Sequence, residues 1–255
     1  MKSLFLAWQG PADSSRSRAW FPVGRLDAET VDAEKQLSHY RFRYTGGALK
    51  AEQDVGFAPL LAFPDFRQNY ESAELFPLFK NRVISPKRGD FQEYIQWLDL
   101  DLGQADPVSI LSVSGGERVT DNLEVFPQVT ADASGNFQVR FFLHGLRHLG
   151  AKAIERAATL KVGEELRIFV ELNNPATRLA VPLLTEDYQM IGWAPRYLMD
   201  DLIQCVPHAP ELSAKVARIN VDAAPMNQRI LIDYKGRAPQ GTQPMSTPDF
   251  KPLLD

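Results

Sequence analysis

Residues 141–202 constrain the fold more than any other stretch of the chain. The stretch begins with an apolar run and a compact basic turn at residues 144–148, and a charged, helix-like segment follows. A second apolar run at residues 166–172 leads into Asn174-Pro175, and the stretch closes with Gly192-Trp193 ahead of a segment that a proline begins. Proline fits the first turn of a helix. The order therefore predicts strands and turns with short helices between them.

This order resembles the HIRAN domain, a small OB-like β-barrel that is attached to some helicases and chromatin remodellers. The domain also occurs in bacterial proteins without a helicase. Its landmarks are an early Gly-x-Arg-aromatic turn, a strand that ends in Asn-Pro, and a Gly-aromatic segment that leads to a helix. The corresponding residues here are Gly145, Asn174-Pro175 and Gly192-Trp193. The resemblance covers residues 137–236 and implies an OB-like barrel in the C-terminal half.

A second resemblance covers residues 18–100. A Val-Gly-Arg-Leu strand at residues 23–26 and a Tyr-x-Phe-x-Tyr strand at 40–44 precede a Phe-Pro segment and a helix near Asn81. This order is similar to the N-terminal subdomain of HipA-type kinases, which implies an α/β module here. The nucleotide-binding and catalytic half of those kinases has no counterpart in the chain, so the resemblance implies no kinase activity.

The sequence predicts three parts. They are a HipA-subdomain-like module at residues 1–115, a HIRAN-like β-barrel at 121–238 and a flexible tail at 239–255. The boundary follows the Gly115-Gly116 turn, where the chain also becomes highly charged. The tail is rich in Pro, Gln, Thr and Gly, a composition typical of an exposed terminus.

Along the whole chain, periodicity and turn signals predict a mainly β protein with short helices, of the α+β class. The first 44 residues and the predicted barrel supply the strands. Residues 45–57 are expected to form a turn and an irregular link, and residues 108–113 a strand. Helices are expected at residues 90–98, 150–160 and 196–205.

The charge and cysteine content restrict the function. The formal net charge is −4 and the pI about 5.7, so a nucleic-acid site would have to be a local basic patch. Cys205 is the single cysteine, which fits a reducing compartment. No apolar run approaches the roughly 20 residues of a membrane-spanning helix. We therefore expect a cytoplasmic protein that does not enter the membrane.

Motifs of common enzymes are missing. The sequence contains no phosphate-binding Gly-x-x-x-x-Gly-Lys-Ser/Thr loop, no Gly-x-Ser-x-Gly elbow and no His-Glu-x-x-His pair. His144 and His148 have the spacing of a helical metal pair, but Gly145 and the apolar run before it predict a strand and a turn. The expectation is a non-enzymatic protein without a metal or another cofactor.

The HIRAN resemblance implies a nucleic-acid site. Arg147 and His148 stand where helicase HIRAN domains place an arginine and an aromatic residue that meet the 3′-terminal nucleotide. Trp193 and Arg196 stand where members of that family have a histidine and a lysine that approach a base and a phosphate. The alternative is that Trp193 belongs to the core and that Arg196 pairs with Asp200. The full set of expected nucleic-acid-binding residues is Arg147, His148, Asn174, Thr177, Trp193, Arg196 and Tyr197.

The sequence departs from the family at one place. HIRAN domains that hold a free 3′ end carry Asn-Pro-Tyr-Asp, whereas this chain reads Asn174-Pro175-Ala176-Thr177. The stacking ring and the charged acceptor are both replaced, which makes strict recognition of a 3′ end doubtful. Binding to a single-stranded DNA backbone, or to a protein, is expected to survive these replacements better. The second hypothesis is a protein-interaction role, in which the chain is an antitoxin-like partner of a separate HipA-type kinase or of a repressor.

Overall fold

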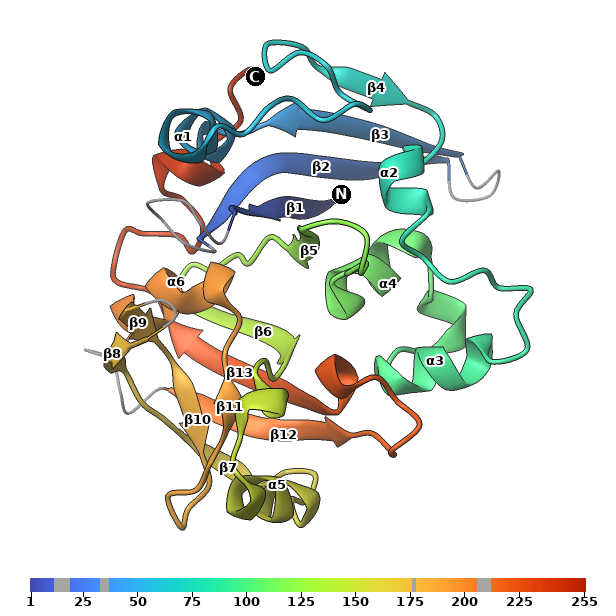
Figure 1. Ribbon diagram of the computed structural model, residues 1–255. Helices are drawn as coiled ribbons and strands as arrows, with labels where there is room; N and C mark the ends of the chain where they lie inside the picture. Colours follow the sequence, from blue (N-terminus) through green and yellow to red (C-terminus); the bar gives the residue numbers. More distant parts are fainter. Residues whose placement is uncertain (12–18, 33–36, 176–177, 206–211) are drawn as a thin grey trace. The chain divides into compact units, whose positions relative to one another are not determined.

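The computed structural model describes residues 1–11, 19–32, 37–175, 178–205 and 212–255. The described chain is mainly β, with thirteen strands in antiparallel sheets and a few short helices (Figure 1), which confirms that part of the prediction. Contacts divide the chain into two units. Unit 1 comprises Met1–Gln92, Asp101–Gln128 and Met245–Asp255; unit 2 comprises Glu93–Leu100 and Val129–Pro244. The sequence predicted a single boundary instead of this interleaving.

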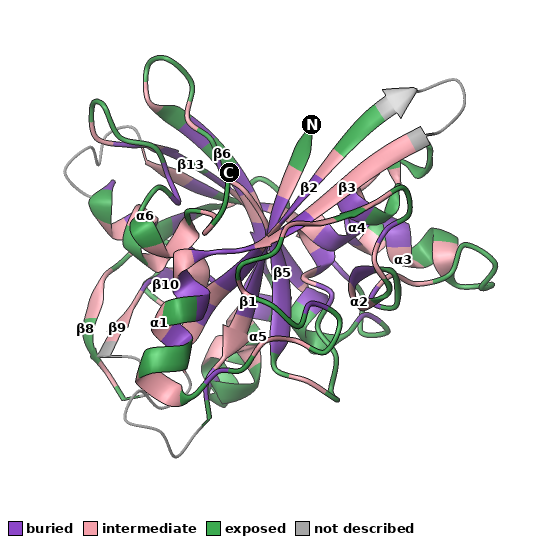
Figure 2. Cartoon of the chain, turned by 90° about the horizontal axis from the view of Figure 1, so that it is seen from above, coloured by how far each residue is buried: buried purple, intermediate pink, exposed green. Residues whose placement is uncertain are grey.

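Unit 1 contains a five-stranded sheet with the strand order β4-β3-β2-β1-β5. Buried residues are concentrated on β1, β5 and the middle of β2 (Figure 2), and Phe42 of β3 stacks on Phe63 with ring centroids 3.9 Å apart. The strands are β1 (Lys2–Gln9), β2 (Trp20–Asp32), β3 (Leu37–Tyr44), β4 (Tyr70–Ser72) and β5 (Leu123–Pro127). The helices are α1 (Gly46–Val55), α2 (Pro77–Lys80), η1 (Leu102–Gln104), α4 (Pro107–Ser114) and η6 (Pro248–Phe250).

Two helices of unit 1 correct the sequence prediction. Within residues 45–57 the chain forms α1 (Gly46–Val55), and residues 108–113 lie within α4, so the irregular link and the strand predicted there are wrong. In α1 the two glycines make room: a Cβ on Gly47 would lie 2.2 Å from the carbonyl oxygen of Pro22. In α4 the Asp106 side chain accepts hydrogen bonds from the first-turn N–H groups, a helix start that outweighs the β-branched composition.

The last eleven residues belong to unit 1, whereas the sequence predicted a flexible tail. The Leu253 N–H donates to the carbonyl oxygen of Tyr44 at 2.8 Å, and the Gly46 N–H donates to that of Lys251 at 2.9 Å. The Phe250 ring packs edge-on against Phe5, with centroids 5.0 Å apart. Backbone hydrogen bonds and a ring contact therefore order a segment whose composition alone is typical of disorder.

Unit 2 contains a six-stranded sheet with the order β11-β10-β7-β12-β13-β6 and a separate pair, β8-β9. The strands are β6 (Asn136–Phe142), β7 (Glu165–Ile168), β8 (Glu171–Asn174), β9 (Arg178–Ala180), β10 (Pro182–Leu184), β11 (Met190–Trp193), β12 (Ser213–Ile219) and β13 (Ile230–Arg237). The helices are η2 (Leu146–His148), α5 (Ala151–Ala158), η3 (Arg196–Leu198), α6 (Met199–Gln204) and η5 (Met226–Gln228). The helices predicted at 150–160 and 196–205 are confirmed by α5 and by η3 with α6.

The helix α3 (Phe91–Trp97) confirms the prediction of a helix at residues 90–98. The segment at its C-terminal end is held by unit 2. Asp99, with a positive φ of 54°, accepts hydrogen bonds from Arg140 and Arg218. The Asn220 side chain donates to the carbonyl oxygen of Trp97 at 2.8 Å. These contacts explain why residues 93–100 group with unit 2.

The two edges of the six-stranded sheet meet just beyond β6. His144, two residues past β6, forms an antiparallel bridge with Trp193 at the end of β11. The His144 N–H donates to the Trp193 carbonyl oxygen at 2.9 Å, and the Trp193 N–H donates back at 3.0 Å. The sheet therefore curls on itself at this point, and both segments of the bridge lead directly into residues that the sequence singled out.

Candidate nucleic-acid interface

The bridge between His144 and Trp193 places Gly145 against the indole of Trp193. Gly145 has a φ of 78°, and a Cβ added there would lie 2.4 Å from Cε3 of Trp193. A side chain at this position would therefore meet both an unfavourable backbone conformation and a ring. The glycine of the basic turn is needed for close approach to the tryptophan.

Glu171, at the start of β8, fixes the other side of the indole. Its Oε2 accepts a hydrogen bond from Nε1 of Trp193 at 3.2 Å and another from Nδ2 of Asn174 at 2.9 Å. All three side chains are half-buried. Hydrogen bonds to a carboxylate are stronger than those between neutral groups, so both partners are held in one orientation. We call Gly145, Glu171, Asn174 and Trp193 the Trp193 site.

The structure thus brings together the three landmark residues Gly145, Asn174 and Trp193, which are far apart in sequence. Sequence reasoning missed Glu171, the residue that joins two of them. A glutamate in a short strand is usually assigned to the solvent face, and its partner Trp193 lies 22 residues away. The available signal was its position at the start of the strand that ends in Asn174-Pro175.

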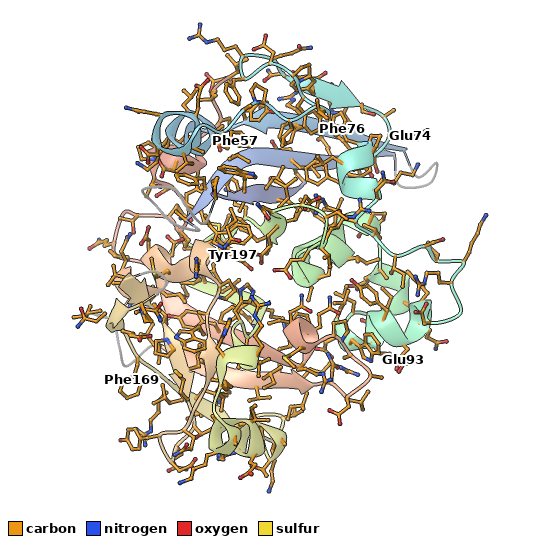
Figure 3. The ribbon with its side chains drawn as sticks, viewed as in Figure 1. Phe57, Glu74, Phe76, Glu93, Phe169 and Tyr197 are labelled. Atoms are coloured by element: carbon orange, nitrogen blue, oxygen red, sulfur yellow. The ribbon has the colours of Figure 1, made fainter. Side chains whose placement is uncertain are left out.

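The basic residues of the prediction lie on the two segments that leave the bridge. Arg147 and His148 are exposed in η2, and Nε of Arg147 donates to Nε2 of His148 at 3.1 Å. Arg196 and Tyr197 are half-buried in η3, three and four residues after Trp193 (Figure 3 labels Tyr197). Segments that pair antiparallel leave a bridge in opposite directions. The two arginines therefore do not belong to one continuous turn.

The hydrogen bond within η2 joins two exposed side chains. A guanidinium has only donors, so Nε2 of His148 is the acceptor. Because both side chains are exposed, this bond adds little to stability. It leaves the charge of Arg147 at the surface, where an anionic ligand can reach it. The predicted Thr177 lies outside the described residues.

Metal binding and thiol chemistry are the other possibilities for the described residues. Within them, no cluster of three or more His, Cys, Asp or Glu side chains is arranged to hold a metal ion. Burial, with a contribution from Asp201, raises the pKa of Cys205 to about 11, so its thiol stays protonated and unreactive at neutral pH. In the part of the chain that the structure describes, no helix has the length and apolar character to cross a membrane.

Comparisons with known proteins do not assign this chain to a family. No family model matches the chain, and no curated protein matches it. Among solved structures, the crystal structure of a protein from Lactobacillus plantarum covers 40% of this chain and 97% of its own, with 18% sequence identity and a TM-score of 0.31. A likeness of that size carries no argument about fold or function.

Proposed function

We propose that the chain is a non-enzymatic nucleic-acid-binding protein whose HIRAN-like barrel, in unit 2, contacts single-stranded or end-bearing DNA through the Trp193 site. The observation that carries the proposal is the half-buried indole of Trp193, held between Gly145 and the Glu171 carboxylate. It stands where the HIRAN resemblance implies a contact with a base. A ring that is already fixed loses little conformational freedom when a base stacks on it.

The energies favour stacking together with backbone contacts. A base stacked on an aromatic ring contributes about 1–3 kcal/mol. Arg147 and Arg196 supply charged donors for phosphate oxygens, and such bonds are stronger than neutral ones. The protein is acidic overall, so only the few arginine contacts with phosphate attract the DNA. The affinity is therefore modest and sensitive to salt.

Glu171 argues against strict recognition of a 3′ end. Its Oε2 already accepts from Asn174 and Trp193, and a carboxylate repels a phosphate placed close to it. A terminal hydroxyl would have to compete with two existing donors. We therefore expect that blocking the 3′ hydroxyl changes the affinity little.

Fluorescence anisotropy with the full chain tests the proposal. The probes are oligonucleotides with a 3′ hydroxyl or a 3′ phosphate, each titrated at two salt concentrations. We expect weak binding of both, with a salt slope of about −0.7 per phosphate contact. The double variant Arg147→Glu/Arg196→Glu should lose binding.

The matched control is Lys161→Glu/Lys235→Glu, which makes the same charge change at two other exposed positions of unit 2. It should retain more affinity than the arginine variant. Equal binding by wild type and the arginine double variant would leave the DNA hypothesis without a site. The protein-interaction role with a HipA-type kinase would then be the better explanation.

A further inference from the structure

Unit 2 exposes a second aromatic group, outside the Trp193 site. The side chains of Phe169 and Tyr188 are 41% and 59% exposed, and their rings meet edge to face with centroids 6.3 Å apart. The guanidinium carbon of Arg167 lies 4.8 Å from the centroid of the Tyr188 ring. Figure 3 shows Phe169 on the outside of the β7–β10 part of the unit. We call Arg167, Phe169 and Tyr188 the Tyr188 cluster.

The turn that carries Tyr188 is held in place from both sides. Tyr188 has a φ of 61°, a conformation that costs a non-glycine residue roughly 1–2 kcal/mol. Its N–H donates to the carbonyl oxygen of the buried Thr185 at 3.0 Å. The neighbouring Asp187 accepts from Nε of Arg156, on α5, at 2.9 Å. An aromatic ring is therefore presented to solvent on a fixed hairpin turn between β10 and β11.

The strand register connects the Tyr188 cluster to the Trp193 site. The Phe169 N–H donates to the carbonyl oxygen of Pro182 at 3.1 Å, and Pro182 pairs with Trp193 in the next strand. Residues directly opposite each other in antiparallel strands point to the same face. Two strand spacings amount to about 10 Å. Phe169 and Trp193 therefore flank the buried Pro182 on one face of the sheet.

We propose that the Tyr188 cluster is a second base-stacking position, which binds the same DNA single strand as the Trp193 site. This inference rests on the proposed function. Exposed rings on one face of a small sheet, with arginine beside them, are the surface on which successive bases stack regardless of sequence. Arg167 stacks on Tyr188 and carries the positive charge that a nearby phosphate requires. One such barrel covers roughly 4–16 nucleotides of a single strand, so one strand can reach two positions that lie about 10 Å apart.

Variants that keep or remove the ring test the inference in the full chain, with a twelve-nucleotide oligothymidine as the probe. Phe169→Leu and Tyr188→Leu should each weaken binding about 5- to 150-fold, the range of a lost stacked base. Phe169→Tyr and Tyr188→Phe should bind as the wild type does. Val162→Ala, at another exposed apolar residue, is the control and should not change the affinity.

The dependence on salt separates stacking from charge. Loss of a ring should leave the slope of log affinity against log salt unchanged, whereas the single variant Arg147→Gln, which removes one phosphate contact and still binds, should reduce that slope. Leucine variants that bind as tightly as wild type would overturn this inference alone, provided that the arginine double variant still loses binding. Leucine and ring-keeping variants that weaken binding equally would show a structural role and would also overturn it. A wild type that binds no oligonucleotide would overturn this inference and the proposed function together.

Discussion

Glu124 is the residue whose environment most opposes its charge. It lies on β5 and is only 4% exposed. Burial raises the pKa of its carboxyl well above the usual value, and the nearby Glu117 raises it further. Because the folded-state pKa is raised, the neutral Glu124 carboxyl stabilises the fold. This contribution to the free energy of unfolding is complete below the unfolded-state pKa of about 4.3 and is lost as the pH rises through the folded-state pKa.

Glu124→Gln should therefore stabilise the protein at neutral pH. The amide keeps the shape of the side chain and cannot ionise, so the free energy of unfolding at pH 7–8 should rise by on the order of 1 kcal/mol. At pH 4 and below the variant and the wild type should be equally stable. Urea denaturation from pH 4 to 8 measures this difference. A wild type as stable as the variant at pH 8 would contradict the assignment.

Single residues also show how far the sequence can be interpreted. Gly145, Asn174 and Trp193 were identified from the HIRAN resemblance, and the structure places them in one site. Glu171 was not, because its contact with Trp193 exists only once the edges of the sheet meet. No local pattern encodes a contact that depends on closure of a sheet. Side-chain pairing of this kind is the part of the site that sequence reasoning misses.

At the scale of elements, α4 shows how a capping signal can outweigh composition. Its sequence, Pro107–Ser114, contains the β-branched residues Val108, Ile110 and Val113, which favoured a strand. Asp106 accepts from the N–H groups of Val108 and Ser109, and Gly115 ends the helix with a φ of 73°. The stop and start residues were visible in the sequence. The helix they delimit buries Val108, Ile110 and Leu111.

Asp106→Ala should destabilise the protein by about 1 kcal/mol at neutral pH, the usual cost of a lost helix cap. Asp106→Asn is the matched control, because asparagine also caps helices and should retain most of the stability. Burial raises the pKa of Asp106, but hydrogen bonds from Lys2 and Ser109 outweigh it and the pKa is lowered. The contribution of the carboxylate is thus present above the unfolded-state value of about 3.9 and is lost as the pH falls.

Denaturation of both Asp106 variants at pH 7 and pH 3 measures these effects. The difference in free energy of unfolding between wild type and Asp106→Ala should be smaller at pH 3 than at pH 7. The contact with Lys2 is half-exposed and contributes little. An Asp106→Asn variant as unstable as Asp106→Ala at pH 7 would show that the charge, and not the cap, is responsible.

At the scale of the whole molecule, the sequence predicted the mainly β class but not the way in which the units are assembled. Each unit is built from segments that are distant in the chain. Composition assigned the last residues to a flexible tail because it reports only local preference. These residues are ordered by their contacts with β1, β3 and α1. Contacts such as the one between Phe5 and Phe250 leave no periodic signal.

Truncation after Pro244 should therefore weaken unit 1 and leave the folding of unit 2 intact. The shortened chain loses the Phe250 ring from Phe5 and the hydrogen bond from Leu253 to Tyr44. Hydrogen exchange should quicken in β1, β2 and β3, because their neighbours become exposed, and stay slow in β6, β12 and β13. Phe250→Ala should lower the free energy of unfolding by about 1–3 kcal/mol, which is part of the effect of the truncation. Leu254→Ala, at an exposed residue, should have little effect. Equal exchange in both sets of strands after truncation would show that the segment from Met245 to Asp255 does not stabilise unit 1 in particular.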